Sequence, residues 1–131
     1  MIMLDTSFVL AYYNTRDQNH DEAAKMAKGL FSQPLYITNY IFGEIVTVSF
    51  FKLKNLGRAK SIGKTVLDSC NLLHLESEEF EDAWKLFSSQ KLKLSFVDCT
   101  TITAMKSQRI PSIATFDGDF SKVEGIKVVG K

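Results

Sequence analysis

The chain has 131 residues, of which 45% are hydrophobic and 24% are charged. This length and composition are typical of one globular domain that buries a core without disulfides or a structural metal. Sixteen basic residues face fifteen acidic ones, which excludes a globally basic nucleic-acid-binding protein. A nucleic-acid partner would therefore have to be bound by a local patch of charge.

The sequence carries no sign of membrane insertion or export. No apolar stretch approaches the roughly 20 residues that span a bilayer, and the N-terminus lacks the basic region and cleavage site of a signal peptide. We therefore expect a cytoplasmic protein with no membrane contact. Cys70 and Cys99 are isolated in the sequence, as are His20 and His74, which predicts two reduced thiols and no zinc site.

Short apolar runs alternate with segments of helical periodicity along the whole chain. The apolar runs are typical of strands buried in a parallel sheet and cover residues 2–4, 35–37, 72–75, 112–116 and 126–129. Helices are predicted over residues 7–13, 20–30, 40–54 and 58–68, with another after a cap at Ser77 and a last one at or just after Asp98. This alternation predicts a single α/β domain over residues 1–131, a three-layer sandwich with a mostly parallel central sheet and helices on both faces.

The helix that follows Ser77 has large apolar residues at helical spacing. We expect its buried stripe to consist of Phe80, Ala83, Trp84 and Phe87. On this interpretation Trp84 belongs to the core and is not a base-stacking platform.

Two further groups of residues concern surfaces. A run of five cations, which is either a solvated face or a phosphate-contacting rim, consists of Lys52, Lys54, Arg58, Lys60 and Lys64. A set of aromatic residues that one small domain would not bury completely, which favours a homodimer, consists of Phe31, Tyr36, Tyr40, Phe50 and Phe51.

Four acidic residues occupy comparable positions in the predicted elements. Asp5 and Asp117 each follow an apolar strand, Asp98 lies at a helix start, and Glu44 lies about a turn into an otherwise apolar helix. Each acid alone could be a turn residue or a solvated charge. In a parallel sheet, however, strand carboxyl ends and the following helix N-termini share one edge, so we expect all four carboxylates to meet there.

Such a group of carboxylates requires compensation. Like charges a few ångströms apart raise one another's pKa, and no basic residue lies beside any of the four in sequence. A divalent metal is the natural partner, and ligation by oxygen alone favours Mg²⁺ or Mn²⁺. A metal held in this way beside a phosphodiester activates water and stabilises the charge on the oxygens.

Several motifs make the chain resemble a known family. The segments Met3-Leu4-Asp5-Thr6-Ser7, Ser95-Phe96-Val97-Asp98 and Ala114-Thr115-Phe116-Asp117-Gly118-Asp119-Phe120, with Glu44 in its apolar helix, are similar to the motifs of PIN-domain ribonucleases. Length and motif order resemble the small VapC-type toxins of toxin–antitoxin pairs. The resemblance implies a PIN-like fold, a metal-dependent endoribonuclease acting on single-stranded RNA, a homodimer and a small antitoxin partner.

The same resemblance assigns roles to individual residues. Asp5 and Asp98 correspond to the principal metal ligands, with Glu44 and Asp117 completing a catalytic pocket for Mg²⁺ or Mn²⁺. Ser7 corresponds to a hydroxyl that supports the first acid. Asp119 is an alternative to Asp117 as the fourth acid, either as an outer ligand or as a turn residue.

Two other functions compete with a nuclease. A response-regulator receiver needs an acidic pair after its first strand and a lysine at the end of its last, whereas Asp5 has no acidic neighbour and Lys127 lies inside a strand. A non-catalytic PIN-like module that binds RNA or protein is the stronger alternative. Such a module would typically have lost an acid, and this chain has all four.

Overall fold

Five parallel strands form one sheet in the order β3-β2-β1-β4-β5. The computed structural model describes residues 1–130, and the strands within them are β1 (Ile2–Leu4), β2 (Leu35–Thr38), β3 (Asn71–Leu73), β4 (Ser112–Ala114) and β5 (Lys127–Val129). Every strand pairing in this range is parallel, with Met3 of β1 opposite Tyr36 of β2 and Ile113 of β4. The central position of β1 explains why all three of its residues are apolar and buried.

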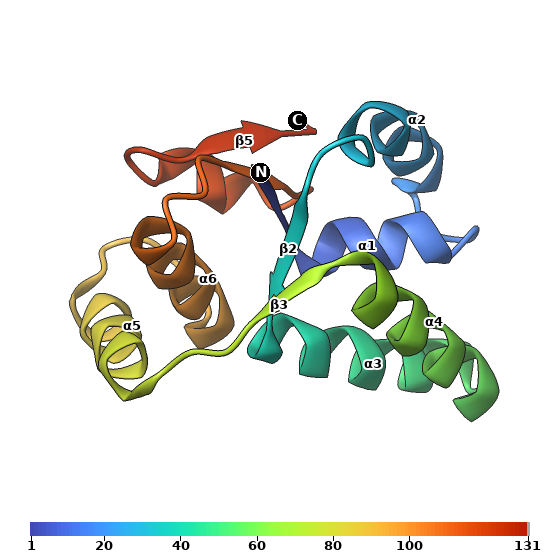
Figure 1. Cartoon of the computed structure of the whole chain (residues 1–131), viewed down its shortest axis with the longest axis horizontal. Coiled ribbons are helices and arrows are strands. Elements are labelled where there is room, and N and C mark those ends of the chain that lie inside the picture. The colour runs from blue at the N-terminus through green and yellow to red at the C-terminus, as the bar shows by residue number, and fades with distance from the viewer. Residues whose placement is uncertain (131) are drawn as a thin grey trace.

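Six α-helices and one 3₁₀-helix cover the sheet in the described part of the chain. They are α1 (Thr6–Tyr13), α2 (His20–Leu30), α3 (Asn39–Leu53), α4 (Leu56–Ser69), α5 (Ser77–Ser89), α6 (Phe96–Ser107) and η1 (Gly118–Lys122). Figure 1 shows α5 and α6 on one side of the sheet and α1, α2 and α4 on the other. Helix α3 packs against α1, α4 and α6. The predicted three-layer α/β architecture is therefore confirmed, and no helix in residues 1–130 is long and apolar enough to cross a membrane.

Several element boundaries differ from the prediction by a few residues. Helix α4 begins two residues early because the Asn55 side chain accepts a hydrogen bond from the Arg58 amide at 3.0 Å, which caps the helix. Helix α5 is preceded by Glu76 and not by a cap at Ser77, since the Glu76 amide donates to Glu79 Oε1 at 3.1 Å. The last two strands are also shorter than expected, and the chain leaves β4 at Ala114.

The predicted buried stripe of α5 is wrong. Only Ala83 is buried, whereas Phe80, Trp84 and Phe87 are exposed, Trp84 by 57%. Helix α5 lies at the outside of its layer (Figure 1) and packs chiefly on α6, while the Phe80 ring also lies 6.4 Å from the Tyr40 ring of α3. A helix that packs mainly on one neighbour buries a narrow stripe, and here a small residue lies at its centre.

The close contact between α3 and α4 depends on Gly63. A Cβ atom at this position would lie 2.9 Å from Val46 Cγ1 of α3. The glycine therefore allows the two helices to approach closely, and α4 completes the layer that covers α3. The buried apolar residues of α3 and α4 belong to the same hydrophobic core as those of the sheet, α1 and α6.

Candidate functional site

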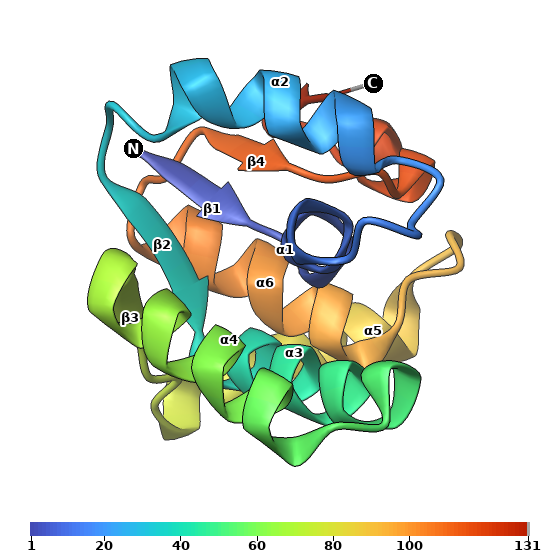
Figure 2. The same ribbon diagram turned by 90° about the vertical axis from the view of Figure 1, so that its right-hand side faces the viewer.

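Asp5 directly follows β1 and occupies the N-cap position of α1. Its amide donates to Ala114 O at 3.0 Å, which extends the pairing of β1 with β4 by one residue. Figure 2 shows β1 leading straight into α1 at this edge of the sheet. Only 5% of Asp5 is exposed, so the carboxylate lies at the carboxyl end of the central strand, largely enclosed by protein.

Two hydroxyl groups hold the Asp5 carboxylate. Thr115 Oγ1 donates to Asp5 Oδ2 at 2.7 Å, and Ser7 Oγ donates to the same oxygen at 2.8 Å. Burial raises the pKa of Asp5, while the hydrogen bonds from Thr115, Ser7 and the Thr6 backbone lower it; the charge on Glu44 raises it further. Ser7 thus lies where the resemblance expected a supporting hydroxyl.

The two hydroxyls that contact Asp5 also accept hydrogen bonds from the backbone. Ser7 Oγ accepts from the Phe116 amide at 3.0 Å, and Thr115 Oγ1 accepts from the Asp117 amide at 2.9 Å. The two hydroxyl oxygens also lie 3.1 Å from each other, and each, with its single proton, lies within hydrogen-bond distance of Asp5 Oδ2. The arrangement therefore suits an ionised carboxylate, which only accepts hydrogen bonds, and it links Asp5 to the turn that carries Asp117.

Asp98 is the third residue of α6 and forms a capping box with Ser95. The Asp98 amide donates to Ser95 Oγ at 3.0 Å, and the Ser95 amide donates to Asp98 Oδ2 at 3.0 Å. The pKa of Asp98 is raised chiefly by burial and further by the charges on Asp5 and Asp117, while the hydrogen bonds with Ser95 lower it. One carboxylate oxygen is thus occupied in fixing the helix start from which Asp98 projects.

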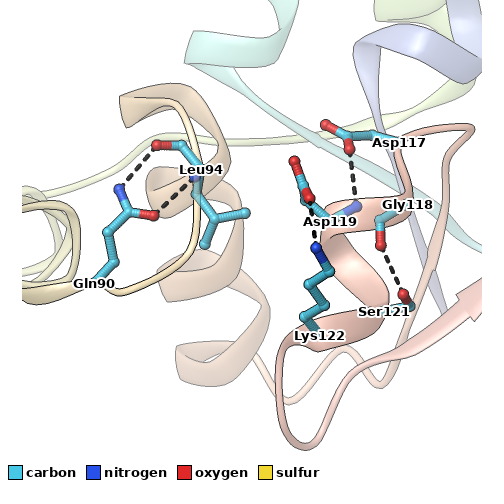
Figure 3. A network of polar contacts seen from close by, with 7 residues as sticks. All are labelled: Gln90, Leu94, Asp117, Gly118, Asp119, Ser121 and Lys122. Atoms are coloured by element: carbon cyan, nitrogen blue, oxygen red, sulfur yellow. Dashed lines mark hydrogen bonds and ion pairs between the residues drawn. The ribbon is translucent and has the colours of Figure 1, made fainter.

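The loop that leads to this helix is itself fixed by Gln90. The Gln90 amide group donates through Nε2 to Leu94 O at 2.9 Å and accepts through Oε1 from the Leu94 amide at 2.8 Å (Figure 3). Ser95 is the next residue along the chain. Gln90 therefore positions the capping box of Asp98 from the end of α5.

Asp117 and Asp119 have different surroundings. Asp117 caps η1 and accepts from the Asp119 amide through Oδ1 at 2.9 Å, whereas Asp119 Oδ1 lies 3.4 Å from Lys122 Nζ (Figure 3). Asp119 therefore has a cation for its charge. Asp117 contributes to the raised pKa of Asp98, which places it within electrostatic reach of the other acids.

The four carboxylates are joined by a chain of electrostatic interactions. Asp5 interacts with Glu44, Asp98 with Asp5, and Asp98 with Asp117. Glu44 reaches this edge as the sixth residue of α3, a helix that begins after its cap at Thr38. Within residues 1–130 the single ion pair is that of Asp119 with Lys122, so the four acids lack a lysine or arginine partner there.

This donor set suits a hard divalent cation. All four groups are carboxylates, the ligand type of Mg²⁺ and Mn²⁺, and protein cations do not offset their charge. In residues 1–130 no three Asp, Glu, His or Cys side chains lie close enough together to form a ready-made metal site. Carboxylates repel one another until a cation offsets their charge, so it is the chemistry of the donor set that fits a divalent metal.

Both cysteines lie outside this chemistry. Cys70 and Cys99 are free, as predicted. Burial raises the pKa of each thiol to about 11, and for Cys99 the charge on Asp98 adds to the effect. A thiol with such a pKa is protonated at neutral pH and is a poor nucleophile or metal ligand.

Sequence reasoning missed three residues that hold the acids in place: Ser95, Thr115 and Gln90. The Ser95-x-x-Asp98 spacing is a recognisable capping-box signal. Thr115 lies directly after a strand that neighbours β1, so parallel pairing would bring it near Asp5. For Gln90 the sequence gives no comparable signal, because its contact with Leu94 depends on the loop conformation.

Comparison with known proteins places most of the chain in one family. Residues 2–126 match the model of the PIN domain family. The chain belongs to that family. The resemblance drawn from the four acidic motifs is therefore confirmed, and the candidate site lies within the matched PIN domain.

Solved PIN-like structures include several toxins. The sarcin-ricin loop cleaving toxin VapC20 of Mycobacterium tuberculosis is 26% identical with a TM-score of 0.86, and the alignment covers 98% of both chains. A toxin–antitoxin complex from Klebsiella pneumoniae matches at 19% identity and a TM-score of 0.72, covering 98% of this chain and 96% of that one. VapBC2 of Rickettsia felis, bound to a promoter DNA fragment, matches at 13% identity and a TM-score of 0.75, with 98% of each chain covered. No curated protein matches the sequence.

Proposed function

We propose that this PIN domain is a metal-dependent endoribonuclease that cleaves phosphodiester bonds in single-stranded RNA. The observation that carries the proposal is the group of four interacting carboxylates, Asp5, Glu44, Asp98 and Asp117, without a protein cation to neutralise them. Ionised carboxylates repel one another at short distance, so holding them together is energetically unfavourable unless they bind a cation. Their position at the carboxyl edge of a parallel sheet is the usual position for a ligand site.

Each of the four acidic side chains has its own role in binding the metal. Asp5 and Asp98 are the principal ligands, and Glu44 and Asp117 complete the negative pocket. Mg²⁺ or Mn²⁺ bound there would supply Lewis acidity and an activated water for attack on phosphorus. Ser7 and Thr115 keep Asp5 oriented and favour its ionised form, and Ser95 does the same for Asp98.

We assign Asp117, and not Asp119, as the fourth acid. Asp119 is offset by Lys122, whereas Asp117 acts on the pKa of Asp98. Asp119 also donates its amide to Asp117 Oδ1, so its contribution is to hold the turn that orients Asp117.

We further propose that the protein is the toxin of a toxin–antitoxin pair and forms a homodimer. The likeness to VapC20 and to the Klebsiella pneumoniae toxin–antitoxin complex supports an antitoxin partner. Of the five aromatic residues that we expected the core not to bury completely, three are exposed: Phe31, Phe50 and Phe51. The other two, Tyr36 and Tyr40, are partly buried. An apolar hollow between α3 and α4 adds Leu56 and Leu67 to this surface, as an association surface requires.

A metal titration combined with a cleavage assay on mixed-sequence single-stranded RNA tests the enzymatic proposal. We expect no cleavage in EDTA and recovery on addition of excess Mg²⁺ or Mn²⁺. The purified Asp98→Asn variant controls for a contaminating nuclease, because its activity should remain low at every metal concentration. RNA binding without cleavage at any metal concentration would favour the non-catalytic PIN-like module instead.

A further inference from the structure

A polar groove leads away from the carboxylates along α1. It consists of two adjoining hollows of about 490 and 380 Å³ that share Asn14, Arg16 and Lys52. The first hollow begins at Ser7, whose hydroxyl donates to Asp5. The second ends at Arg58. The groove therefore runs from Ser7, which contacts Asp5, to the cations at its other end.

The arrangement of α1 and α3 creates this polarity. The two helices pack together, and each begins at the acidic edge of the sheet, after Asp5 and Thr38 respectively. The eight residues of α1 extend about 12 Å at 1.5 Å per residue. Lys52 lies in the last turn of α3, and Arg16 lies in the loop after α1. Acids and cations thus occupy opposite ends of one helix pair.

The cations in the groove form no ion pairs with acidic side chains in residues 1–130. The side chains of Arg16 and Lys52 are exposed and form neither hydrogen bonds nor ion pairs with other residues in the range 1–130. Arg58 Nη2 donates only to the Tyr13 carbonyl at 3.3 Å. Asp17, the single acid that lines the groove, accepts from the Asn19 amide at 2.8 Å through Oδ1. Three cations therefore face one carboxylate.

Helix-dipole stabilisation does not account for this grouping. A cation is favourable in the last turn of a helix, which applies to Lys52 in α3. Arg58 lies in the first turn of α4, where the dipole disfavours a positive charge, and Arg16 lies outside any helix. What the three side chains share is the groove.

We propose that this groove binds the phosphate backbone of the RNA on one side of the scissile bond, with Arg16, Lys52 and Arg58 contacting phosphates. The inference rests on the proposed ribonuclease function. A chain with almost no net charge has to obtain its phosphate affinity locally. An acidic site also repels a polyanion, so substrate binding needs cations beside it. Polar side chains along the walls, such as Asn14 and Gln18, suit phosphate and sugar contacts.

The structure assigns four of the five cations in the run to two different surfaces, and Lys54 lines neither. Lys52 and Arg58 line the polar groove and form the phosphate-contacting part. Lys60 and Lys64 line the apolar hollow between α3 and α4 instead. Lys64 therefore provides a matched control, since it belongs to the same run of sequence but faces a different surface.

Salt-dependent RNA binding tests the groove directly. Fluorescently labelled single-stranded RNA is titrated with the full chain carrying Asp98→Asn, which prevents cleavage, in Mg²⁺ buffer at several salt concentrations. Adding Lys52→Gln or Arg16→Gln should weaken binding and reduce the slope of log affinity against log salt by about 0.7 for each phosphate that the variant no longer neutralises. Lys64→Gln and Lys85→Gln remove the same charge elsewhere and should leave the slope unchanged. Lys52→Arg, which keeps the charge, should restore it.

Cleavage kinetics of the otherwise unaltered chain provide the second readout. Lys52→Gln should raise KM several-fold with kcat retained, because the lysine binds phosphate equally well in the ground state and the transition state. Equal slopes and equal KM values for groove and control variants, in a chain that cleaves RNA, would overturn the groove proposal and leave the ribonuclease proposal intact. A parent chain that neither binds nor cleaves RNA would overturn both.

Discussion

The carboxylate edge and the outer surface of α5 differ in how completely their side chains are satisfied. Around Asp5, the hydroxyls of Ser7 and Thr115 and the amides that they accept from have partners, and the carboxylate is enclosed by β1, β4 and α1; the buried Thr6 hydroxyl is the one polar group there without a partner in residues 1–130. On α5, Trp84 and Phe87 stack on each other with ring centroids 6.0 Å apart while both remain exposed. A closed polar network fixes one geometry for chemistry, whereas an open apolar surface is completed only by another molecule.

The largest effect should come from removing one charge at the closed edge. Asp5→Asn or Asp98→Asn keeps shape and keeps an oxygen to accept the existing hydrogen bonds, but it removes charge that a divalent cation requires. RNA cleavage should fall by at least about 10²–10³-fold, the usual result of removing one electrostatic interaction with the transition state. Initial rates on single-stranded RNA at saturating Mg²⁺ measure this change.

Asp119→Asn is the matched control for these substitutions. It removes the same charge from a neighbouring residue whose carboxylate is offset by Lys122, so the loss in rate should be much smaller. Parent-like cleavage by Asp5→Asn and Asp98→Asn, or unfolding of either variant well below the parent's melting temperature, would show that these aspartates are structural.

The next largest effect should come from opening the polar network without changing a charge. Thr115→Val keeps the side-chain shape but removes the donor to Asp5 Oδ2 and the acceptor for the Asp117 amide. We expect a loss of about 1–3 kcal/mol in the free energy of unfolding, typical of an unsatisfied buried polar group. The pKa of Asp5 should also rise, because a hydrogen bond that lowers it is removed. As the pH is lowered, Asp5 should therefore become protonated, and cleavage should decline, at a higher pH than in the parent.

Thr101→Val separates stability from site chemistry. Thr101 is also buried, but its hydroxyl donates to the Val97 carbonyl at 3.0 Å within α6. Urea denaturation of both variants gives the stability loss, and the pH profile of cleavage shows which variant alters Asp5. A shift of the profile with Thr101→Val but not with Thr115→Val would contradict the role assigned to Thr115.

The same contrast explains what the sequence could predict. The parallel sheet and the shared edge follow from buried apolar runs that alternate with helices, so the positions of Asp5 and Asp98 follow from backbone topology, whereas the order of the strands was not predicted. The α5 surface could not be predicted in this way. Phe80, Trp84 and Phe87 have the spacing of a core stripe, and hydrophobic periodicity does not state how many neighbours a helix has.

Side-chain partners were harder to predict than backbone positions. Thr115 and Gln90 act through contacts that depend on the geometry of a turn and a loop, and neither belongs to a periodic pattern. The cationic groove likewise combines Arg16, Lys52 and Arg58 from three separate segments. Sequence showed a run of charge, but only the fold divides that run between two different surfaces.

The stability of the metal-free protein should depend on pH in a direction set by Asp5. Its pKa is raised above the ordinary value of 3.8, mainly by burial, so the native state holds this proton more tightly than the unfolded chain does. The stabilisation from protonation is complete below the unfolded pKa and is lost as the pH rises through the folded pKa. In EDTA, Asp5→Asn should therefore be as stable as the parent or slightly more stable at neutral pH.

Denaturation of parent and Asp5→Asn between pH 7 and pH 4 measures this dependence. The advantage of the variant should shrink as the pH falls, because the parent carboxyl becomes neutral as well. An advantage that grows on acidification would mean that the hydrogen bonds from Ser7 and Thr115 outweigh burial, and that Asp5 has a lowered pKa.

The smallest effect on stability should come from the open surface. Trp84 is 57% exposed and Phe51 is 70% exposed, so Trp84→Glu and Phe51→Glu should each change the free energy of unfolding of the monomer by no more than about 0.5 kcal/mol, the range of ordinary surface substitutions. A buried tryptophan or phenylalanine would cost about 3–5 kcal/mol on truncation.

Light scattering at micromolar concentration should show a dimer for the parent, and at least one of the two variants should be monomeric, since a charge within a buried apolar contact is strongly unfavourable. The exposed Lys85→Gln substitution on α5 should leave the dimer intact. A monomeric parent would remove the homodimer from the proposal, while dimeric forms of both glutamate variants would move the interface away from α3 and α5.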